Sequence, residues 1–256
     1  MLGAFSADVD SADFMVELVP RLEPELAAQL PPSRGGVSWK EISQGEWGFK
    51  IQSLAGHVSI DKKVMTLSTT VADVYESAPT LGFLLSRLRL LVILNVTRQG
   101  GIAVHSSAVG HNDRALAFYG PSERGKSTIA RLLSNTWRTL SDETNVILPE
   151  ADRLRLYSTP FCRIEDIPRC SNGSGVLAGL FQIEQDERNV ARPLTSREAY
   201  LGLIGSAFFL PNRDKADALM ENCEKILNRV PAHCLRFSNA VLDQVDLVNV
   251  LSRFME

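Results

Sequence analysis

The sequence is poor in cysteine and carries no large excess of charge of either sign. The four cysteines among its 256 residues stand at positions 162, 170, 223 and 234, without a C-x-x-C spacing. So few cysteines argue against a disulfide framework and favour a reduced, cytoplasmic setting. The formal net charge of −3 gives no electrostatic reason to expect nucleic acid or an anionic membrane as a partner.

A signal peptide and a long hydrophobic run are also missing. The opening residues, MLGAFSADVDSADF, have no basic start and no extended apolar stretch, so we expect no secretory signal. The most apolar segment, residues 81–96, is short for a bilayer and is interrupted by Arg87 and Arg89. We therefore expect a buried helix there and no membrane association. The hydrophobic share of 45% is enough for an ordinary globular core.

The pattern along the chain changes near residue 100. A proline- and glycine-rich loop ends near residue 36, and residues 37–70 alternate between polar and apolar positions, which predicts a small antiparallel sheet. A helix is expected over 80–98. We assign residues 1–99 to a β-rich and helical extension that packs on the core, and residues 100–256 to the core itself.

The core is predicted to be an α/β domain, because short apolar strands alternate with helical segments from residue 100 onward. Strands are expected over 101–110, 115–120, 137–148, 154–162, 175–185 and 232–239. Helices are expected over 126–136, 196–210, 215–230 and 240–255.

One segment of the core matches the phosphate-binding pattern G-x-x-x-x-G-K-[ST], between an expected strand and an expected helix. Glycines let successive N–H groups turn toward an anion, and the helix N-terminus adds partial positive charge. A lysine supplies a mobile charge and a serine a ligand for Mg²⁺. The alternative is a chance match on a strand–turn–helix. The predicted nucleotide site consists of Gly120, Pro121, Ser122, Glu123, Arg124, Gly125, Lys126, Ser127 and Thr128.

Two adjacent acids follow the apolar segment WRTL, residues 137–140, which is the next expected strand after the loop helix. Asp142 and Glu143 would lie where open α/β sheets bind ligands. One acid could hold Mg²⁺ and the other could orient or deprotonate a hydroxyl. The alternatives are an acid at a helix start or a solvated turn. His105 ends the strand before the loop; a lone histidine is more often structural than catalytic.

These residues together resemble the catalytic domain of HPr serine kinase/phosphorylase, and in particular the short HPr kinase-like proteins. The resemblance covers about residues 100–248: a histidine followed by small residues, a strand, the loop, a helix, and a strand ending in two acids. It implies a fold related to that of phosphoenolpyruvate carboxykinase. It also implies an active-site role for His105, a metal and phosphate role for Asp142, and a base role for Glu143.

The sequence departs from that family at two positions. Glu123 replaces a usual loop glycine, and the second acid is Glu143 where the family usually has aspartate. A segment linked with phosphorylase activity is not found, so dephosphorylation is not implied.

The resulting expectation is a phosphotransferase that uses ATP or GTP and Mg²⁺, with Ser127 and Asp142 as metal ligands and His105, Asp142 and Glu143 as catalytic groups. The acceptor would be a hydroxyl of a protein, a peptide or a small alcohol. The alternative is a nucleotide-binding regulatory or scaffold protein that no longer transfers phosphate. The resemblance is compatible with a homo-oligomer, and it leaves the acceptor open.

Overall fold

The computed structural model describes residues 15–19, 38–43, 46–51, 54–59, 64–68, 89, 92–93, 95–159, 161, 171–209, 213–238 and 244–255. The chain divides into two compact units. One is Ala7–Leu91, and the other is Val92–Glu256 together with Met1–Ser6. Of the helix expected over 80–98, most residues lie outside the described part, and residues 95–98 are helical.

The first unit contains a five-stranded sheet in the order β1-β5-β4-β3-β2. Its strands are β1 (Met15–Val19), β2 (Ser38–Ser43), β3 (Glu46–Ile51), β4 (Leu54–Ser59) and β5 (Val64–Ser68). Strands β2 to β5 pair antiparallel in chain order, which confirms the antiparallel sheet expected over residues 37–70. The parallel strand β1 was not expected.

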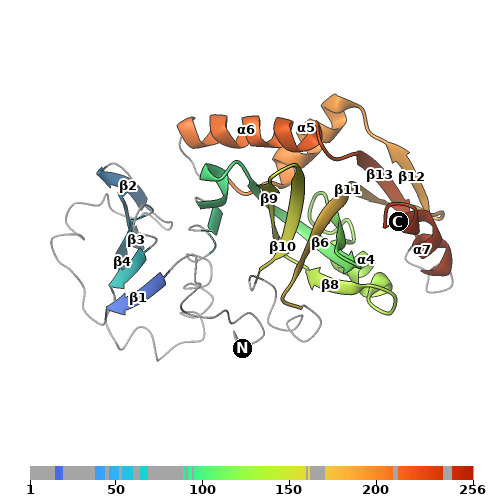
Figure 1. The fold of residues 1–256 in the computed structure, drawn as a ribbon, viewed down its shortest axis with the longest axis horizontal. Coiled ribbons are helices and arrows are strands. Elements are labelled where there is room, and N and C mark those ends of the chain that lie inside the picture. Colours follow the sequence, from blue (N-terminus) through green and yellow to red (C-terminus); the bar gives the residue numbers. More distant parts are fainter. Residues whose placement is uncertain are drawn as a thin grey trace. The chain divides into compact units, whose positions relative to one another are not determined.

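The second unit is built on an eight-stranded mixed sheet in the order β10-β9-β6-β7-β11-β13-β12, with β8 beside β6 (Figure 1). Its strands are β6 (Ile102–His111), β7 (Arg114–Tyr119), β8 (Arg138–Ser141), β9 (Thr144–Glu150), β10 (Arg153–Ser158), β11 (Ser174–Gln185), β12 (Val190–Pro193) and β13 (Ala232–Phe237). Strand β10 also pairs with the start of β11, so β10, β9, β6, β7 and β11 form a closed ring of pairings.

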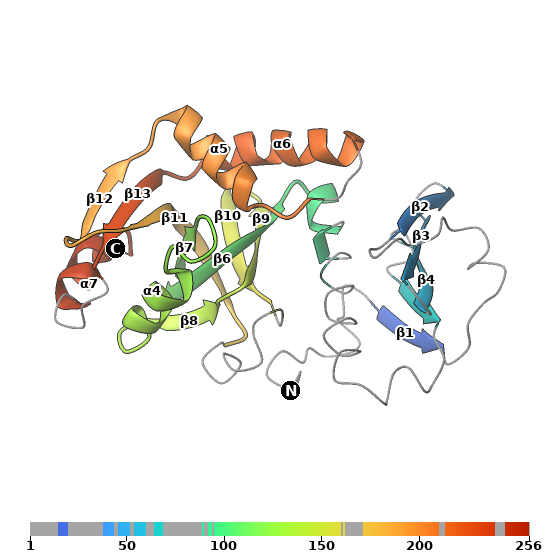
Figure 2. The same ribbon diagram turned by 180° about the vertical axis from the view of Figure 1, so that it is seen from behind.

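Helices cover both faces of this sheet (Figures 1 and 2). They are α4 (Lys126–Leu133), α5 (Ser196–Ser206), α6 (Arg213–Leu227) and α7 (Gln244–Ser252). Leu203 of α5 and Cys223 of α6 join one hydrophobic cluster. Ile129 of α4 and Leu251 of α7 join the other. Helix α5 begins with a capping box between Thr195 and Glu198.

Strand β7 shows why the sheet has two buried faces. Its residues alternate between the two clusters: Ala117 and Tyr119 pack with α5 and α6, whereas Leu116 and Phe118 pack with α4 and α7. All four side chains are buried, which explains why the sequence of this strand is a continuous apolar run. This confirms the expected α/β fold, and it adds that helices cover both faces of the sheet.

The strand expected over 137–148 is present in two pieces, β8 and β9, which are separated by Asp142 and Glu143. Both pieces pair antiparallel with β6 along one continuous line, so the chain keeps its direction through the two acids. The sheet is mixed: β7, β11 and β13 run parallel, and the other pairings are antiparallel.

The described residues contain no helix that is both long enough and apolar enough to cross a membrane.

Candidate functional site

The loop from Gly120 to Thr128 connects the end of β7 to the start of α4. Three of its residues have left-handed φ angles: Gly120 (147°), Glu123 (66°) and Gly125 (99°). Glycine adopts such angles without steric cost, whereas glutamate does so rarely. The loop residues 121–124 are exposed, so the Glu123 side chain is in contact with solvent.

The lysine of the loop is folded back against the loop. Lys126 is only 7% exposed, and its Nζ donates hydrogen bonds to the carbonyl oxygens of Gly120 (3.0 Å) and Pro121 (3.1 Å). Its own carbonyl oxygen accepts a hydrogen bond of 2.8 Å from Ser107 Oγ, which ties the start of α4 to β6. The cation therefore lies at the mouth of the loop, next to a helix N-terminus that lacks a side-chain cap.

Gly125 is the N-cap residue of α4, and any other residue type would be strained there. A β-carbon on Gly125 would lie 2.6 Å from Phe237 Cζ and 3.5 Å from Gln185 Nε2. The loop thus packs directly against the ends of β11 and β13. Close packing and a left-handed φ angle both require glycine at this position.

Asp142 and Glu143, together called the acid turn below, form the irregular step between β8 and β9. Strand β6 pairs antiparallel with β7 on one side and with β8 and β9 on the other, so β7, β8 and β9 run in the same direction. Tyr119, at the end of β7, pairs with Ser106, and Ser106 N donates to the Glu143 carbonyl oxygen. The acids therefore lie level with the start of the loop, on the other side of β6. Asp142 is 8% exposed.

His105 lies on β6, between the loop and the acids. Its Nδ1 is 3.4 Å from Glu143 Oε1, and their side chains are 29% and 21% exposed. The Phe208 ring meets the imidazole edge-on, with centroids 6.0 Å apart. A carboxylate that accepts from Nδ1–H fixes the tautomer of a histidine, which leaves Nε2 as an acceptor. The structure thus brings together two of the three residues that the sequence predicts to be catalytic.

Buried polar groups hold the acid turn in place. The Glu143 carbonyl oxygen accepts from Ser106 N at 3.3 Å. The Thr144 carbonyl oxygen accepts from Ser141 Oγ (3.0 Å) and Thr159 Oγ1 (2.6 Å). Asn145 Nδ2 donates to the Ser106 carbonyl oxygen at 2.8 Å. These bonds fix the backbone that carries both carboxylates, because buried polar groups are costly to leave unpaired.

Sequence reasoning missed these supporting residues and Phe208. The run His105-Ser106-Ser107 contained the signal for part of them, since small hydroxyl residues inside an apolar strand need internal partners. Nothing in the sequence placed Phe208 near His105, because long-range backbone contacts join their segments: Val104 pairs with Ala207, and Phe208 N donates to the Ala103 carbonyl oxygen at 2.8 Å.

The residues expected to bind Mg²⁺ are compatible with that ion. No three His, Cys, Asp or Glu side chains converge on a point anywhere in the part of the chain that the structure describes. Mg²⁺ does not need such a cluster, because it keeps several waters and takes one or two carboxylates plus phosphate oxygens. The exposed Ser127 hydroxyl and the Asp142 carboxylate are oxygen donors of the required type. The roles given to Ser127, Asp142, Glu143 and His105 remain predictions.

Strand β7 ends in a buried hydroxyl group. Tyr119, which immediately precedes the loop, is fully buried. Burial, with a smaller contribution from Cys234, raises the pKa of its hydroxyl above the ordinary value of 10.0. Likewise, burial raises the pKa of the Cys223 thiol to about 12, so this thiol is inert at neutral pH.

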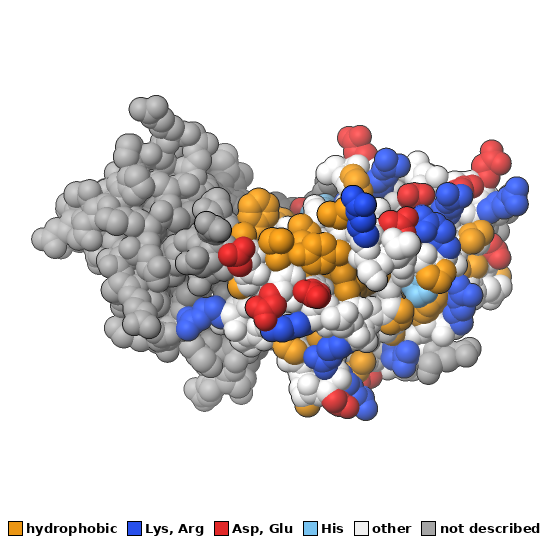
Figure 3. Space-filling model, turned by 90° about the horizontal axis from the view of Figure 1, so that it is seen from above, with side chains coloured by type: hydrophobic (Ala, Val, Ile, Leu, Met, Phe, Trp, Pro, Cys, Tyr) orange, Lys and Arg blue, Asp and Glu red, His pale blue; other side chains and the backbone are white. Residues whose placement is uncertain are grey.

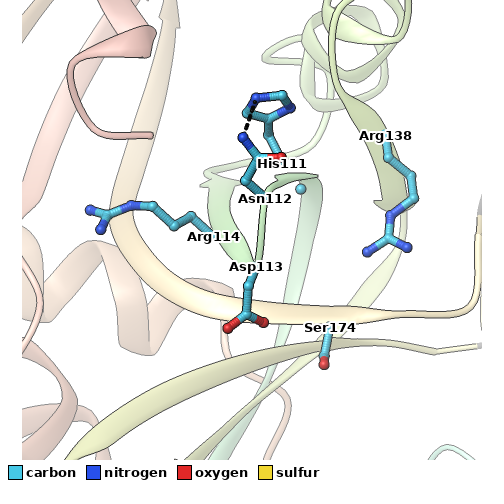
Figure 4. A pocket seen from close by; sticks show the side chains of 7 residues that line it. His111, Asn112, Asp113, Arg114, Arg138 and Ser174 are labelled. Atoms are coloured by element: carbon cyan, nitrogen blue, oxygen red, sulfur yellow. Dashed lines mark hydrogen bonds between the residues drawn. The ribbon is translucent and has the colours of Figure 1, made fainter. Parts of the chain in front are cut away.

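Two hollows lie outside this edge. One, of about 340 Å³, surrounds the turn between β6 and β7 and is lined by Gly110, His111, Asn112, Asp113, Arg114, Arg138 and Ser174. Figure 4 shows that its charged side chains point in different directions, with Arg114 turned away from Arg138. They do not converge on a common ligand position.

The other hollow, of about 500 Å³, lies between α5 and α6 and includes Tyr200, Glu224 and Leu227. Hydrophobic side chains gather on the face seen in Figure 3. The exposed large hydrophobic residues of α5, α6 and the segment after α5 are Leu201, Met220 and Phe209. Neither hollow contains a residue of the loop or of the acid turn.

No protein-family model matches the chain, and no curated protein matches it. Among solved structures, the chain is similar to the Hpr(Ser) kinase/phosphatase from Coxiella burnetii, with 12% sequence identity and a TM-score of 0.35. The match covers 60% of this chain and 97% of that one. A likeness of this degree carries no argument about activity, which depends on the geometry of the site.

Proposed function

We propose that this chain is a phosphotransferase that binds a nucleoside triphosphate on the loop 120–128 and transfers its terminal phosphoryl group to a hydroxyl. The observation that carries the proposal is the loop itself. Gly125 is left-handed at the start of α4, and Lys126 is buried at the loop mouth, with the acid turn level with the loop across β6. Backbone N–H groups and one lysine at a helix start form an anion-binding site.

The proposed reaction assigns a role to each side chain. Lys126 would exchange its carbonyl partners for the β- and γ-phosphates, and Ser127 and Asp142 would hold Mg²⁺, which would supply positive charge against the developing negative charge. The Glu143 carboxylate accepts the proton of the acceptor hydroxyl. His105 positions Glu143 through the contact between Nδ1 and Oε1. The acceptor oxygen bonds to the γ-phosphorus as its bond to the bridging oxygen breaks, and the nucleoside diphosphate leaves.

A second candidate is a nucleotide-binding regulatory or scaffold protein. Glu123 favours it, because a carboxylate stands within the loop at a left-handed position that glycine would fill more easily. Such a protein would bind the nucleotide and leave it intact.

The two acids distinguish the candidates. We expect Asp142→Asn to abolish turnover and to weaken Mg²⁺-dependent ATP binding about tenfold, because a metal ligand acts in both ground and transition states. Glu143→Gln should slow turnover by about a hundredfold with binding within about twofold, because a general base acts only in the transition state. Calorimetric titration gives binding, and ATP consumption with and without hydroxyl acceptors gives turnover.

The matched control is Asp152→Asn, which removes a carboxylate whose side chain is 88% exposed, in the turn between β9 and β10. It should change neither measurement. If the parent protein binds Mg-ATP but turns over none, and both acid variants bind as the parent does, the scaffold candidate replaces the phosphotransferase.

A further inference from the structure

The side of the loop that faces away from the acids is formed by the end of β11. In the sheet order, β7 lies between β6 and β11, so the acid turn and His105 flank the loop on one side and β11 on the other. Strands β7 and β11 are parallel, and Tyr119 pairs with Gln182. The last residues of β11 therefore extend past the end of β7, at the edge from which the loop emerges.

Gln185 is the final residue of β11, and its amide lies alongside the loop. Its Nε2 would be 3.5 Å from a β-carbon on Gly125. Gln185 is paired with Phe237, the residue on which Gly125 packs. The Gln185 side chain is exposed, and among the described residues its amide takes part in no hydrogen bond.

The backbone beyond Gln185 is held firmly. Asp186 N donates to the Phe237 carbonyl oxygen at 2.9 Å. Asp186 Oδ1 accepts from Glu187 N at 2.7 Å and from Arg188 N at 3.4 Å. Ser238 N donates to Asn189 Oδ1 at 3.0 Å. The turn is thus ordered by its own hydrogen bonds, and it presents one uncommitted amide next to the loop.

We infer that Gln185 contacts the nucleoside and makes the site selective for adenine; this inference rests on the proposed function. The acids fix the γ-phosphate end on the β6 side, so the nucleoside leaves the loop on the β11 side, where Gln185 lies. An amide donates and accepts, and the adenine edge offers the N7 acceptor beside the N6 donor. Guanine presents two acceptors, N7 and O6, so the amide oxygen would have no partner there.

The test compares three probes: Mg-ATP, Mg-GTP and Mg-tripolyphosphate, titrated into the full chain by calorimetry. The parent should bind ATP about tenfold more tightly than either of the others, since a two-point contact with a base edge discriminates by roughly 5- to 150-fold. Gln185→Leu should weaken ATP binding about tenfold and leave GTP and tripolyphosphate within about twofold. The matched control is Gln99→Leu, at an exposed glutamine before β6, which should alter none of the three.

The outcomes separate this inference from the function on which it rests. If the parent binds ATP no more tightly than tripolyphosphate, Gln185 does not contact the base, although the phosphate site is supported. The same conclusion follows if Gln185→Leu lowers all three affinities equally. Equal affinity of the parent for ATP and GTP likewise overturns the inference. If the parent binds neither ATP nor tripolyphosphate, the proposed function fails and this inference fails with it.

Discussion

The two ends of the β6–β7 pair have similar backbone geometry but connect different elements. At one end, Asn112 and Asp113 close a two-residue turn with φ angles of 47° and 63°. Such a turn matches the twist of the strands, and asparagine and aspartate tolerate left-handed angles. At the other end, left-handed angles occur in the loop 120–128, where the chain leaves the sheet to begin α4.

The ends differ in how their charges are held. At the turn, Arg155 Nη1 is 2.6 Å from Asp113 Oδ1, and Arg155 Nε is 3.0 Å from Glu150 Oε2. These opposite charges neutralise one another in solvent. At the loop, Lys126 is buried and bonded to carbonyl oxygens, which a phosphate can replace. The turn connects two strands, whereas the loop has the contacts that the proposed function requires of a phosphate site.

The largest expected effect comes from removing the lysine of the loop, and the control removes an arginine at the turn. Lys126→Ala should lower the affinity for Mg-ATP by about a hundredfold or more, because a unit charge about 4 Å from phosphate is worth several kcal/mol in a partly buried site. Arg155→Ala, at the turn, should leave that affinity unchanged. Calorimetric titration measures both. Equal affinities of Lys126→Ala and the parent would rule out a phosphate-binding role for the loop.

A smaller effect is expected from adding one methyl group. Gly125→Ala forces a non-glycine residue into a left-handed angle and against Phe237, so we expect a loss of about 2 kcal/mol of unfolding free energy. Gly205→Ala is the matched substitution: it lies in α5 with no atom within 4 Å of the added carbon, and should stabilise by about 0.5–1 kcal/mol. Urea denaturation compares them. If both substitutions have the same effect, the packing of the loop against β13 is not tight.

The smallest effect concerns the ion pair at the turn. The hydrogen bond from Arg155, supported by its positive charge, holds the pKa of Asp113 below the ordinary value of 3.8. A carboxyl whose pKa is depressed on folding stabilises the protein above its unfolded pKa, and this contribution is lost as the pH falls through the folded pKa. Asp113→Asn should therefore lower the melting temperature slightly at pH 7. The difference should shrink as the pH falls below the unfolded pKa of about 4, and it should vanish below the folded pKa.

Thermal melts of the parent and Asp113→Asn at pH 7 and pH 3 check this prediction. Mg-ATP affinity at pH 7 should be the same for both proteins, because the turn and the loop lie at opposite ends of β7. A difference in melting temperature that persists unchanged at pH 3 would show that the carboxylate charge is not the cause.

Local chemistry in the sequence was sufficient to predict the loop, its flanking strand and helix, and the acids that follow. These features depend on neighbours in the chain: glycines at a turn, a lysine at a helix start, polar residues that end an apolar run. The split of residues 137–148 into β8 and β9 follows the same logic in retrospect, because Asp142 and Glu143 interrupt the run.

Features set by strand register could not be predicted in that way. The contact between His105 and Glu143 exists because His105 pairs with Thr144 across β6 and β9. Gln185 reaches Gly125 because β11 pairs in parallel with β7, and a parallel pairing leaves no short-range signal. The sequence therefore predicted the individual candidate residues but not which of their side chains are in contact.

The packing of Gly125 on Phe237 has a consequence for the protein during its synthesis. The loop is translated early, but the residue that it packs against belongs to β13, and β11 must pair with both β7 and β13 to bring them together. Chains are made from the N-terminus, and contacts between distant residues form late. A ribosome-bound chain that ends at α4 would carry every residue of the loop without the surface that shapes it. Nucleotide binding by nascent chains should therefore begin only once residue 237 has left the exit tunnel.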